Sequence, residues 1–193
     1  MTVTERFLRY IQVETTSDEA SATCPSTPGQ WDLARLLVDE LQALGVKDAH
    51  VDEHGYVYGT IPAKGSNTRR IGLIAHMDTS DAVKGPTHPQ MVKSYDCGPI
   101  TLKNGTVIDG FDFLPSLKGQ DLIVTDGTSV LGADDKAGVA EIMQLAERLM
   151  QEDAPDHCEL PRKRKAPPRP LPLRPRRRPR PRSLSCPSSA MSP

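Results

Sequence analysis

Two short segments of the chain carry side chains that can bind a metal ion. The first ends in His76 and Asp78, and the second contains the adjacent acids Asp134 and Asp135. A histidine and a carboxylate in this arrangement can both ligate a metal, or the carboxylate can orient the imidazole as a ligand. A carboxylate of the second segment, with two free oxygens, can also bridge two metal ions about 3.5–4 Å apart. The residue types of the two segments therefore suggest part of a two-metal hydrolase site, about half of the ligands that it needs.

Each segment also has an explanation that needs no metal. A histidine and an aspartate at the end of a strand can share an ordinary hydrogen bond in solvent. Acids near the start of a helix cap it and complement its dipole. Neither segment is decisive by itself, although Gly132 and Gly138 flank the paired acids closely.

The elements around these segments predict where the side chains point. Residues Arg70–His76 form a short, almost continuous apolar run, which is typical of a strand buried on both faces. Alternation along such a strand places His76 and Asp78 on one side and Met77 on the other. The carboxyl end of a strand in an open α/β sheet faces the usual ligand crevice. A helix from about Lys136 to Gln151 follows the paired acids.

Further helices and strands complete an α/β layer pattern. Apolar spacings of three and four residues predict two earlier helices, and short β-rich runs predict strands. Thr27 is expected to cap the second helix, with Gln30 in the reciprocal position, and Gly45 is expected to end it. The predicted elements are the helices Thr4–Gln12 and Pro28–Leu44, two short strands within Val51–Pro62 that turn at His54-Gly55, and the strand Leu122–Thr125.

Charge and composition divide the 193 residues into two parts. Residues 1–157 carry 13 Lys+Arg and 24 Asp+Glu, a net charge of 13 − 24 = −11. Residues 158–193 carry 11 Lys+Arg and one acid, a net charge of 11 − 1 = +10, and contain ten prolines. Such a segment cannot bury enough apolar surface to fold, so we expect a disordered basic tail.

The tail has two competing interpretations. Its basic runs resemble a nucleic-acid or nuclear-targeting patch, which would bind phosphates in a salt-sensitive way without reading bases. It contains no aromatic residue for base stacking. An abrupt change to Arg, Pro, Ser and Cys is instead typical of a frame-shifted reading of a GC-rich gene, and we favour that interpretation. Nucleic acid is therefore not an expected partner.

The remaining composition favours a cytoplasmic protein. The four cysteines, Cys24, Cys97, Cys158 and Cys186, have no CxxC spacing, which argues against a disulfide framework or a zinc ribbon. The first ten residues are polar and mixed in charge, unlike a signal peptide, and no apolar run reaches membrane-spanning length.

The two segments together resemble the metal-binding segments of the M20 metallopeptidases, and most closely those of the peptidase T group of tripeptide aminopeptidases. The resemblance lies in Ile74–Ser80 (IAHMDTS) and Leu131–Ile142 (LGADDKAGVAEI), and it extends to Thr15–Asp18 and Pro25–Gln30. It covers residues 3 to about 152. It implies that residues 1–157 are the N-terminal part of a zinc-peptidase catalytic domain, a mixed sheet with flanking helices.

The resemblance also implies roles for individual residues. His76 would ligate one zinc ion, and Asp134 would bridge two. Asp78 would be the active-site carboxylate that orients His76. A cis peptide bond would follow the bridging aspartate, between Asp134 and Asp135. The substrate would be a short peptide, attacked by a zinc-activated water whose proton passes to a glutamate.

The chain departs from the family pattern beyond these segments. The Glu-Glu pair expected further along has no counterpart, since positions 162–182 contain no acid. A later acidic ligand, a distant histidine ligand and an inserted lid or dimerisation domain are missing too. Only His76 and Asp134 remain as ligands, whereas zinc normally takes at least three from the protein. We therefore predict a truncated enzyme that retains little of the activity. The alternatives are a non-enzymatic fragment whose basic tail binds nucleic acid non-specifically, and a non-functional fragment whose exposed sheet edges aggregate.

Overall fold

The computed structural model describes residues 1–63 and 69–151 of the chain. The basic tail, the domain boundary after residue 157, Cys158 and Cys186 lie outside the described residues. The predictions made for them remain predictions.

Helix α1, Val3–Tyr10, begins at a reciprocal cap. The Thr2 hydroxyl accepts a hydrogen bond from the Glu5 backbone N–H at 3.2 Å, and the Glu5 carboxylate accepts one from the Thr2 N–H at 2.7 Å. The predicted first helix is therefore confirmed, although it ends two residues earlier than expected.

Helix α2, Pro28–Ala43, follows Thr27, and the left-handed Gly45 (φ 95°) comes directly after its cap residue. The expected capping bond from Thr27 is wrong. Its hydroxyl donates to the Thr16 carbonyl at 2.9 Å and thus holds the preceding loop. Gln30 likewise accepts from the backbone just before the helix, at 3.1 Å, rather than from the cap residue.

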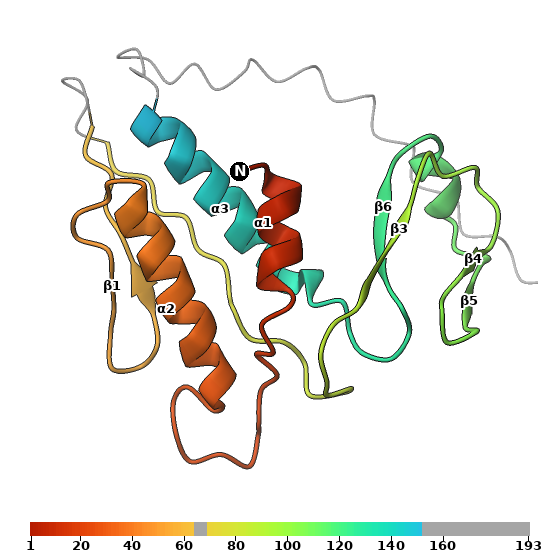
Figure 1. Cartoon of the computed structure of the whole chain (residues 1–193), viewed down its shortest axis with the longest axis horizontal. Coiled ribbons are helices and arrows are strands. Elements are labelled where there is room, and N and C mark those ends of the chain that lie inside the picture. The colour runs from red at the N-terminus through yellow and green to blue at the C-terminus, as the bar shows by residue number, and fades with distance from the viewer. Residues whose placement is uncertain (64–68, 152–193) are drawn as a thin grey trace, which may run out of the picture. The chain divides into compact units, whose positions relative to one another are not determined.

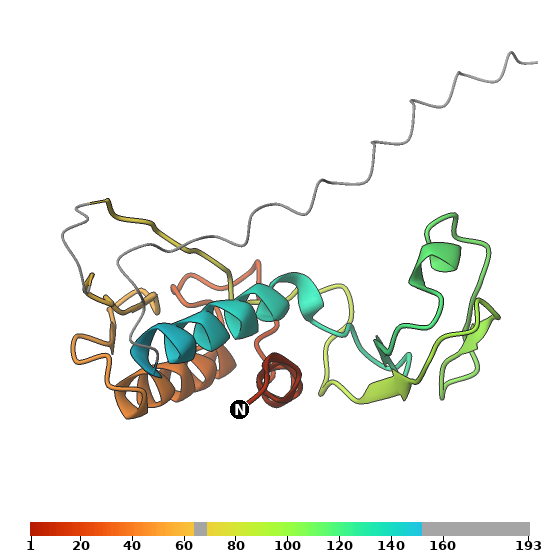
Figure 2. The ribbon, with the colours of Figure 1, turned by 90° about the horizontal axis from the view of Figure 1, so that it is seen from above.

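Helix α3, Ala133–Gln151, contains a kink at its start. Asp134 and Asp135 have non-helical backbone angles, so regular helix begins at Lys136, as predicted. The three helices share one apolar core (Figures 1 and 2). Its buried members on or beside these helices are Phe7, Tyr10, Ile11, Leu33, Leu37, Leu41, Val139, Ala140, Met143 and Ala146.

Short antiparallel strand pairs make up the β-structure. Strands β1, His50–Val51, and β2, Val57–Tyr58, pair around the turn at Gly55 and contact α2, which confirms the predicted hairpin. Strand β6, Leu122–Thr125, was also predicted, and it pairs with β3, Pro89–Val92, which was not.

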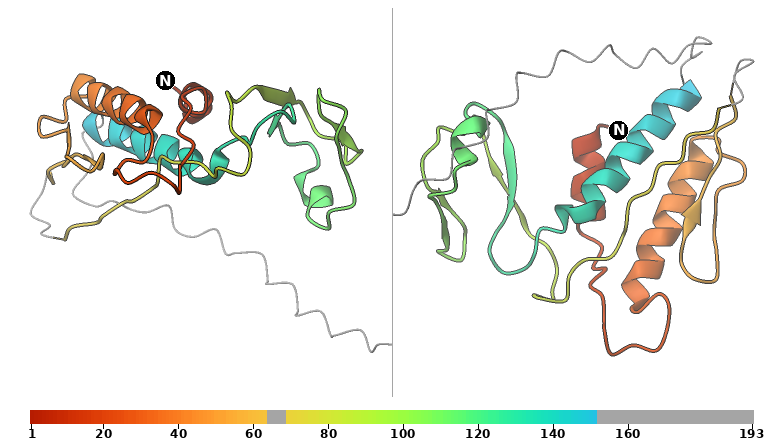
Figure 3. Two further views of the ribbon diagram at one scale, coloured as in Figure 1. Left: turned by 90° about the horizontal axis from the view of Figure 1, so that it is seen from below. Right: turned by 180° about the vertical axis from the view of Figure 1, so that it is seen from behind.

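A second hairpin and a short helical turn lie between β3 and β6 along the chain (Figure 3). The hairpin joins β4, Ile100–Thr101, to β5, Val107–Ile108, and the 3₁₀ turn η1 spans Leu114–Leu117. This region has its own small core, whose buried members are Tyr95, Ile100, Leu102 and Leu114.

The expected strand over Arg70–His76 is wrong. Among the described residues, none forms a strand ladder with Arg70–His76, and Ile71 and Ile74 are 83% and 95% exposed. A strand buried on both faces needs a neighbour along each edge and a layer on each face. In the described part of the chain, the only backbone pairing near this run is the parallel bridge between Thr16 and Thr79.

The mixture of helices and small sheets is consistent with the α/β class. The strands of the described residues form three separate two-stranded ladders rather than one mixed sheet. Within the same residues, no helix is both long and apolar enough to cross a membrane.

Candidate metal centre

The segment that carries His76 is extended, and its side chains alternate between two environments. Ala75 and Met77 pack against the apolar core of the helices. His76 and Asp78 therefore point to the other side, where their side chains are 53% and 50% exposed. The predicted alternation holds although the strand itself does not form.

Hydrogen bonds to the chain after α1 hold this extended segment in place. The buried Thr15 hydroxyl donates to the Met77 carbonyl at 2.6 Å. The Thr79 N–H donates to the Thr15 carbonyl at 3.1 Å, and the Ser17 N–H donates to the Thr79 carbonyl at 2.9 Å. Asp78 consequently lies between two residues with hydrogen-bonded backbone, Met77 and Thr79, and His76 directly precedes them.

The start of α3 presents the second segment. Gly132 has a left-handed backbone (φ 73°), and a cis peptide bond joins Asp134 to Asp135. The Asp135 carboxylate accepts from the Gly138 N–H at 3.2 Å and so caps the regular helix. The Asp134 side chain is 95% exposed. Asp135 therefore caps the helix, whereas the exposed carboxylate of Asp134 is available to a ligand.

The structure brings the two segments together at His76. Its Nε2 lies 2.9 Å from Asp134 Oδ1. Its Nδ1 lies 3.1 Å from the Asp78 carbonyl oxygen and 3.2 Å from Asp78 Oδ1. Nδ1 is placed to donate to Asp78, and with its proton there Nε2 is the nitrogen that a metal can bind.

The surroundings of His76 favour its protonated form. Burial alone would lower the pKa of His76, but the hydrogen bond to Asp134 and the contacts with Asp78 outweigh it and raise the pKa above its ordinary value. When His76 is protonated, Nε2 donates to Asp134 Oδ1. A cation at this position would replace that proton.

A buried lysine next to the paired acids was not recognised in the sequence. Lys136 is 2% exposed, and its Nζ donates to the Val13 carbonyl at 2.7 Å. Burial lowers the pKa of Lys136 to about 8. Its position inside an amphipathic helix resembles that of an ordinary surface lysine, so spacing alone could not identify it.

The residues present fit part of a zinc site. An imidazole nitrogen and a carboxylate oxygen are donors that zinc accepts, and at 2.9 Å they approach a common point. Asp78 lies at the opposite ring nitrogen, a position from which a carboxylate can orient the ring rather than act as a third ligand. No group of three potential ligands occurs among residues 1–63 and 69–151. The geometry thus offers two potential ligands, short of the usual three.

Known proteins with similar sequences agree on one family. The chain is 51% identical over 153 residues to a peptidase T of Geobacillus kaustophilus (strain HTA426), a match that covers 76% of this chain and 37% of the relative. A peptidase T of Bacillus subtilis (strain 168) is 46% identical over 158 residues, with 77% and 38% covered.

A third peptidase T, from Streptococcus pneumoniae (strain ATCC 700669 / Spain 23F-1), is 46% identical over 161 residues, with 81% of this chain and 40% of the relative covered. The chain belongs to the peptidase T family. No protein-family model matches the chain. The matched part spans about two fifths of the length of these relatives, consistent with their N-terminal portion.

Proposed function

We propose that this chain forms part of a zinc-dependent aminopeptidase site that releases the N-terminal residue from tripeptides. The contact between His76 Nε2 and Asp134 Oδ1 at 2.9 Å carries the proposal, because it joins a nitrogen and an oxygen ligand that are 58 positions apart in a peptidase T sequence. The family resemblance supports a peptide substrate. The cytoplasmic location stays a prediction.

In this proposal each residue has one task. His76 would hold zinc through Nε2, while Asp78 would hold the Nδ1 proton and keep the ring in that orientation. Asp134 would be the carboxylate ligand beside His76, with an oxygen to spare for a second zinc ion. Bound zinc would polarise the peptide carbonyl and activate a water molecule. No general base is assigned among the described residues.

The domain context belongs to the same proposal. We infer that residues 1–157 correspond to the first part of a peptidase catalytic domain, in which the extended run through Ile71 and Ile74 belongs to a larger sheet. The exposure of these apolar side chains supports the inference, because a run of this composition is usually buried.

Turnover of tripeptides by the full chain tests the proposed activity. Tri-alanine would be incubated with the protein and zinc, and release of alanine with formation of the dipeptide would be followed by mass spectrometry. We expect release that stops with a chelator and returns with zinc, and that His76→Ala abolishes. His54→Ala is the control, because His54 is an exposed histidine in the β1–β2 turn. No turnover at saturating zinc would exclude the activity for this chain.

A further inference from the structure

Both carboxylate oxygens of Asp78 have a partner. Oδ1 lies 3.2 Å from His76 Nδ1. Oδ2 accepts a hydrogen bond from the Ser17 hydroxyl at 2.8 Å. Ser17 lies 61 positions earlier in the chain, within the Thr15–Asp18 segment of the family resemblance, which assigns it no role. Its side chain touches no metal ligand directly, so any effect on the site must pass through Asp78.

The backbone around Ser17 is held at several points. Its own N–H donates to the Thr79 carbonyl at 2.9 Å, next to Asp78. The carbonyl of the preceding Thr16 accepts from the Thr27 hydroxyl at 2.9 Å, at the start of α2. The backbone that carries the Ser17 hydroxyl is therefore fixed relative to the segment that carries His76.

The same stretch is tied to the second metal-binding segment. The Val13 carbonyl accepts from Nζ of Lys136, two residues after Asp134, at 2.7 Å. Residues 13–17 thus contact the chain next to both proposed ligands. Ser17 is the member of this stretch whose side chain reaches a functional carboxylate.

A second hydrogen bond changes what Asp78 can do. An aspartate held at one oxygen can still exchange between χ1 rotamers and rotate about its broad terminal torsion. A donor at the other oxygen selects one orientation, and hydrogen bonds to a charged acceptor are stronger than neutral ones. With Ser17 in place, Oδ1 stays at His76 Nδ1 and Nε2 stays directed toward Asp134.

We propose that Ser17 is a positioning residue of the metal centre, whose hydroxyl fixes the Asp78 carboxylate so that His76 presents Nε2 beside Asp134. The part of this inference that concerns metal affinity rests on the proposed function. The part that concerns the Asp78 side chain does not, because the hydrogen bond is present without a metal.

The test compares variants of Ser17 with and without a hydroxyl, including a threonine and valine pair of equal shape. Ser17→Thr keeps a hydroxyl, whereas Ser17→Val has the same branched shape without one. Ser17→Ala removes the hydroxyl with the smallest change in volume. Ser116→Ala is the control, because the Ser116 hydroxyl donates to the Phe113 carbonyl at 2.6 Å in η1 and contacts no proposed ligand. Circular dichroism of each full-length variant establishes that it is folded.

Two readouts are measured on each protein. The first is the rotamer distribution of Asp78 without metal, from side-chain three-bond couplings in nuclear magnetic resonance. The second is the dissociation constant for Co²⁺, a spectroscopic substitute for zinc. We expect a single Asp78 rotamer in the wild type and Ser17→Thr, and averaging in Ser17→Val and Ser17→Ala.

We expect Co²⁺ binding to weaken by about three- to tenfold in the two variants without a hydroxyl. This is less than the 10–100-fold loss typical when a direct partner of a ligand is removed. Ser17→Thr and Ser116→Ala should stay close to the wild type. A single Asp78 rotamer in Ser17→Val would overturn the positioning role. If the wild type binds no Co²⁺, the proposed metal site fails, and the Asp78 couplings still decide the role of Ser17.

Discussion

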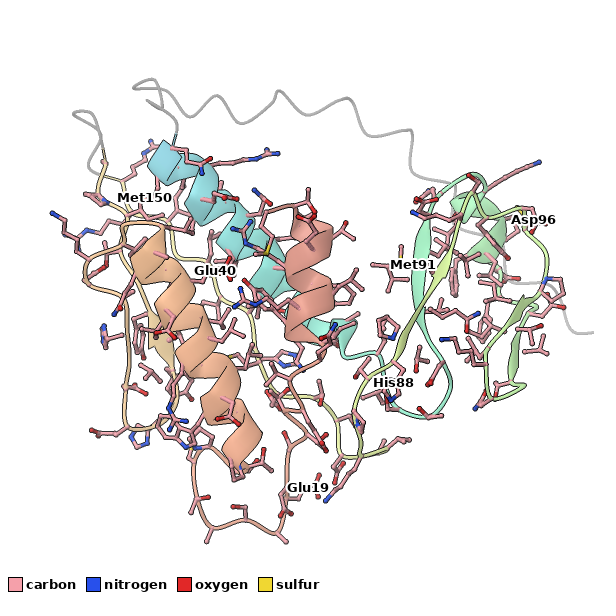
Figure 4. The ribbon with its side chains drawn as sticks, viewed as in Figure 1. Glu19, Glu40, His88, Met91, Asp96 and Met150 are labelled. Atoms are coloured by element: carbon pink, nitrogen blue, oxygen red, sulfur yellow. The ribbon has the colours of Figure 1, made fainter. Side chains whose placement is uncertain are left out.

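Replacing Arg6 with methionine should destabilise the helical core more than any exposed ion pair can. Arg6 is 1% exposed and links all three helices. Its Nε lies 2.6 Å from Glu40 Oε1 on α2, and its Nη1 lies 2.9 Å from Glu147 Oε2 on α3. Glu40 points toward α1 (Figure 4), where it also accepts from the Tyr10 hydroxyl at 2.7 Å.

The size of the effect follows from what the substitution leaves behind. Removing one partner of a buried ion pair typically costs about 3–5 kcal/mol, because the other charge stays buried without its partner. The Glu40 and Glu147 side chains are 10% and 14% exposed, so some water can reach them. We therefore expect the lower end of the range, a loss of about 3 kcal/mol in the free energy of unfolding.

Urea denaturation followed by the fluorescence of Trp31, the single tryptophan, measures this loss. At a slope of about 2 kcal/mol per molar urea, the expected loss lowers the midpoint by about 1.5 M. Lys93→Met is the control, because Lys93 and Asp121 form a 2.7 Å pair with side chains 68% and 50% exposed. That pair should contribute less than about 1 kcal/mol. Equal midpoint shifts in the two variants would refute the reasoning.

Two further predictions concern acid stability and the turn before α3. The hydrogen bond from Arg6 holds the pKa of Glu147 below its ordinary value. The stabilisation that the Glu147 carboxylate gives the fold is therefore complete above the unfolded pKa of about 4.3, and it is lost as the pH falls through the lower native pKa. Glu147→Gln should therefore show a shallower loss of unfolding free energy below about pH 4.3 than the wild type, and equal slopes would contradict this. Gly132→Ala should lower the free energy of unfolding more than Gly110→Ala does. Both glycines have a left-handed backbone (φ 73° and 74°), but a Cβ added at Gly132 would lie 3.0 Å from Thr79 Cγ2, whereas one added at Gly110 would meet nothing within 4 Å. Urea midpoints compare the two variants, and an equal loss would show that the Thr79 contact is unimportant.

The helices could be predicted because their signals are local. The apolar residues of α2 recur at helical spacing, and Gly45 marks its end with a left-handed backbone. The capping role of Thr27 failed for a tertiary reason, since the hydroxyl bonds to Thr16 instead of the helix. β3 escaped prediction because it begins with Pro89 in a loop-rich stretch and has only β6 as a partner.

The run Arg70–His76 supported two predictions, one from its alternation and one from its apolar composition, and only the first is confirmed. Its alternation correctly predicted that His76 and Asp78 point away from Met77, because alternation is a property of any extended backbone. Its apolar composition predicted burial between neighbouring strands. Burial depends on partners that the described residues do not provide, and Ile74 is 95% exposed.

The candidate site was only partly accessible from the sequence. The residue types at His76, Asp78 and Asp134 pointed to metal chemistry, and family resemblance supplied their expected roles. Their meeting at 2.9 Å across 58 positions depends on how α3 packs on the other helices. Ser17 and Lys136 lie within segments of the family resemblance, but their contacts could not be predicted, because each arises from a single hydrogen bond made after folding.

Calorimetric titration of zinc into the full-length, metal-free chain tests the central claim most directly, which is that His76 and Asp134 are zinc ligands. We expect saturable binding in the wild type that weakens at least about tenfold in His76→Ala and in Asp134→Asn, because each removes one of the two ligands proposed among the described residues. Asp112→Asn, an exposed aspartate outside the site, should bind like the wild type. Zinc binding that is unchanged by both His76→Ala and Asp134→Asn would contradict the claim.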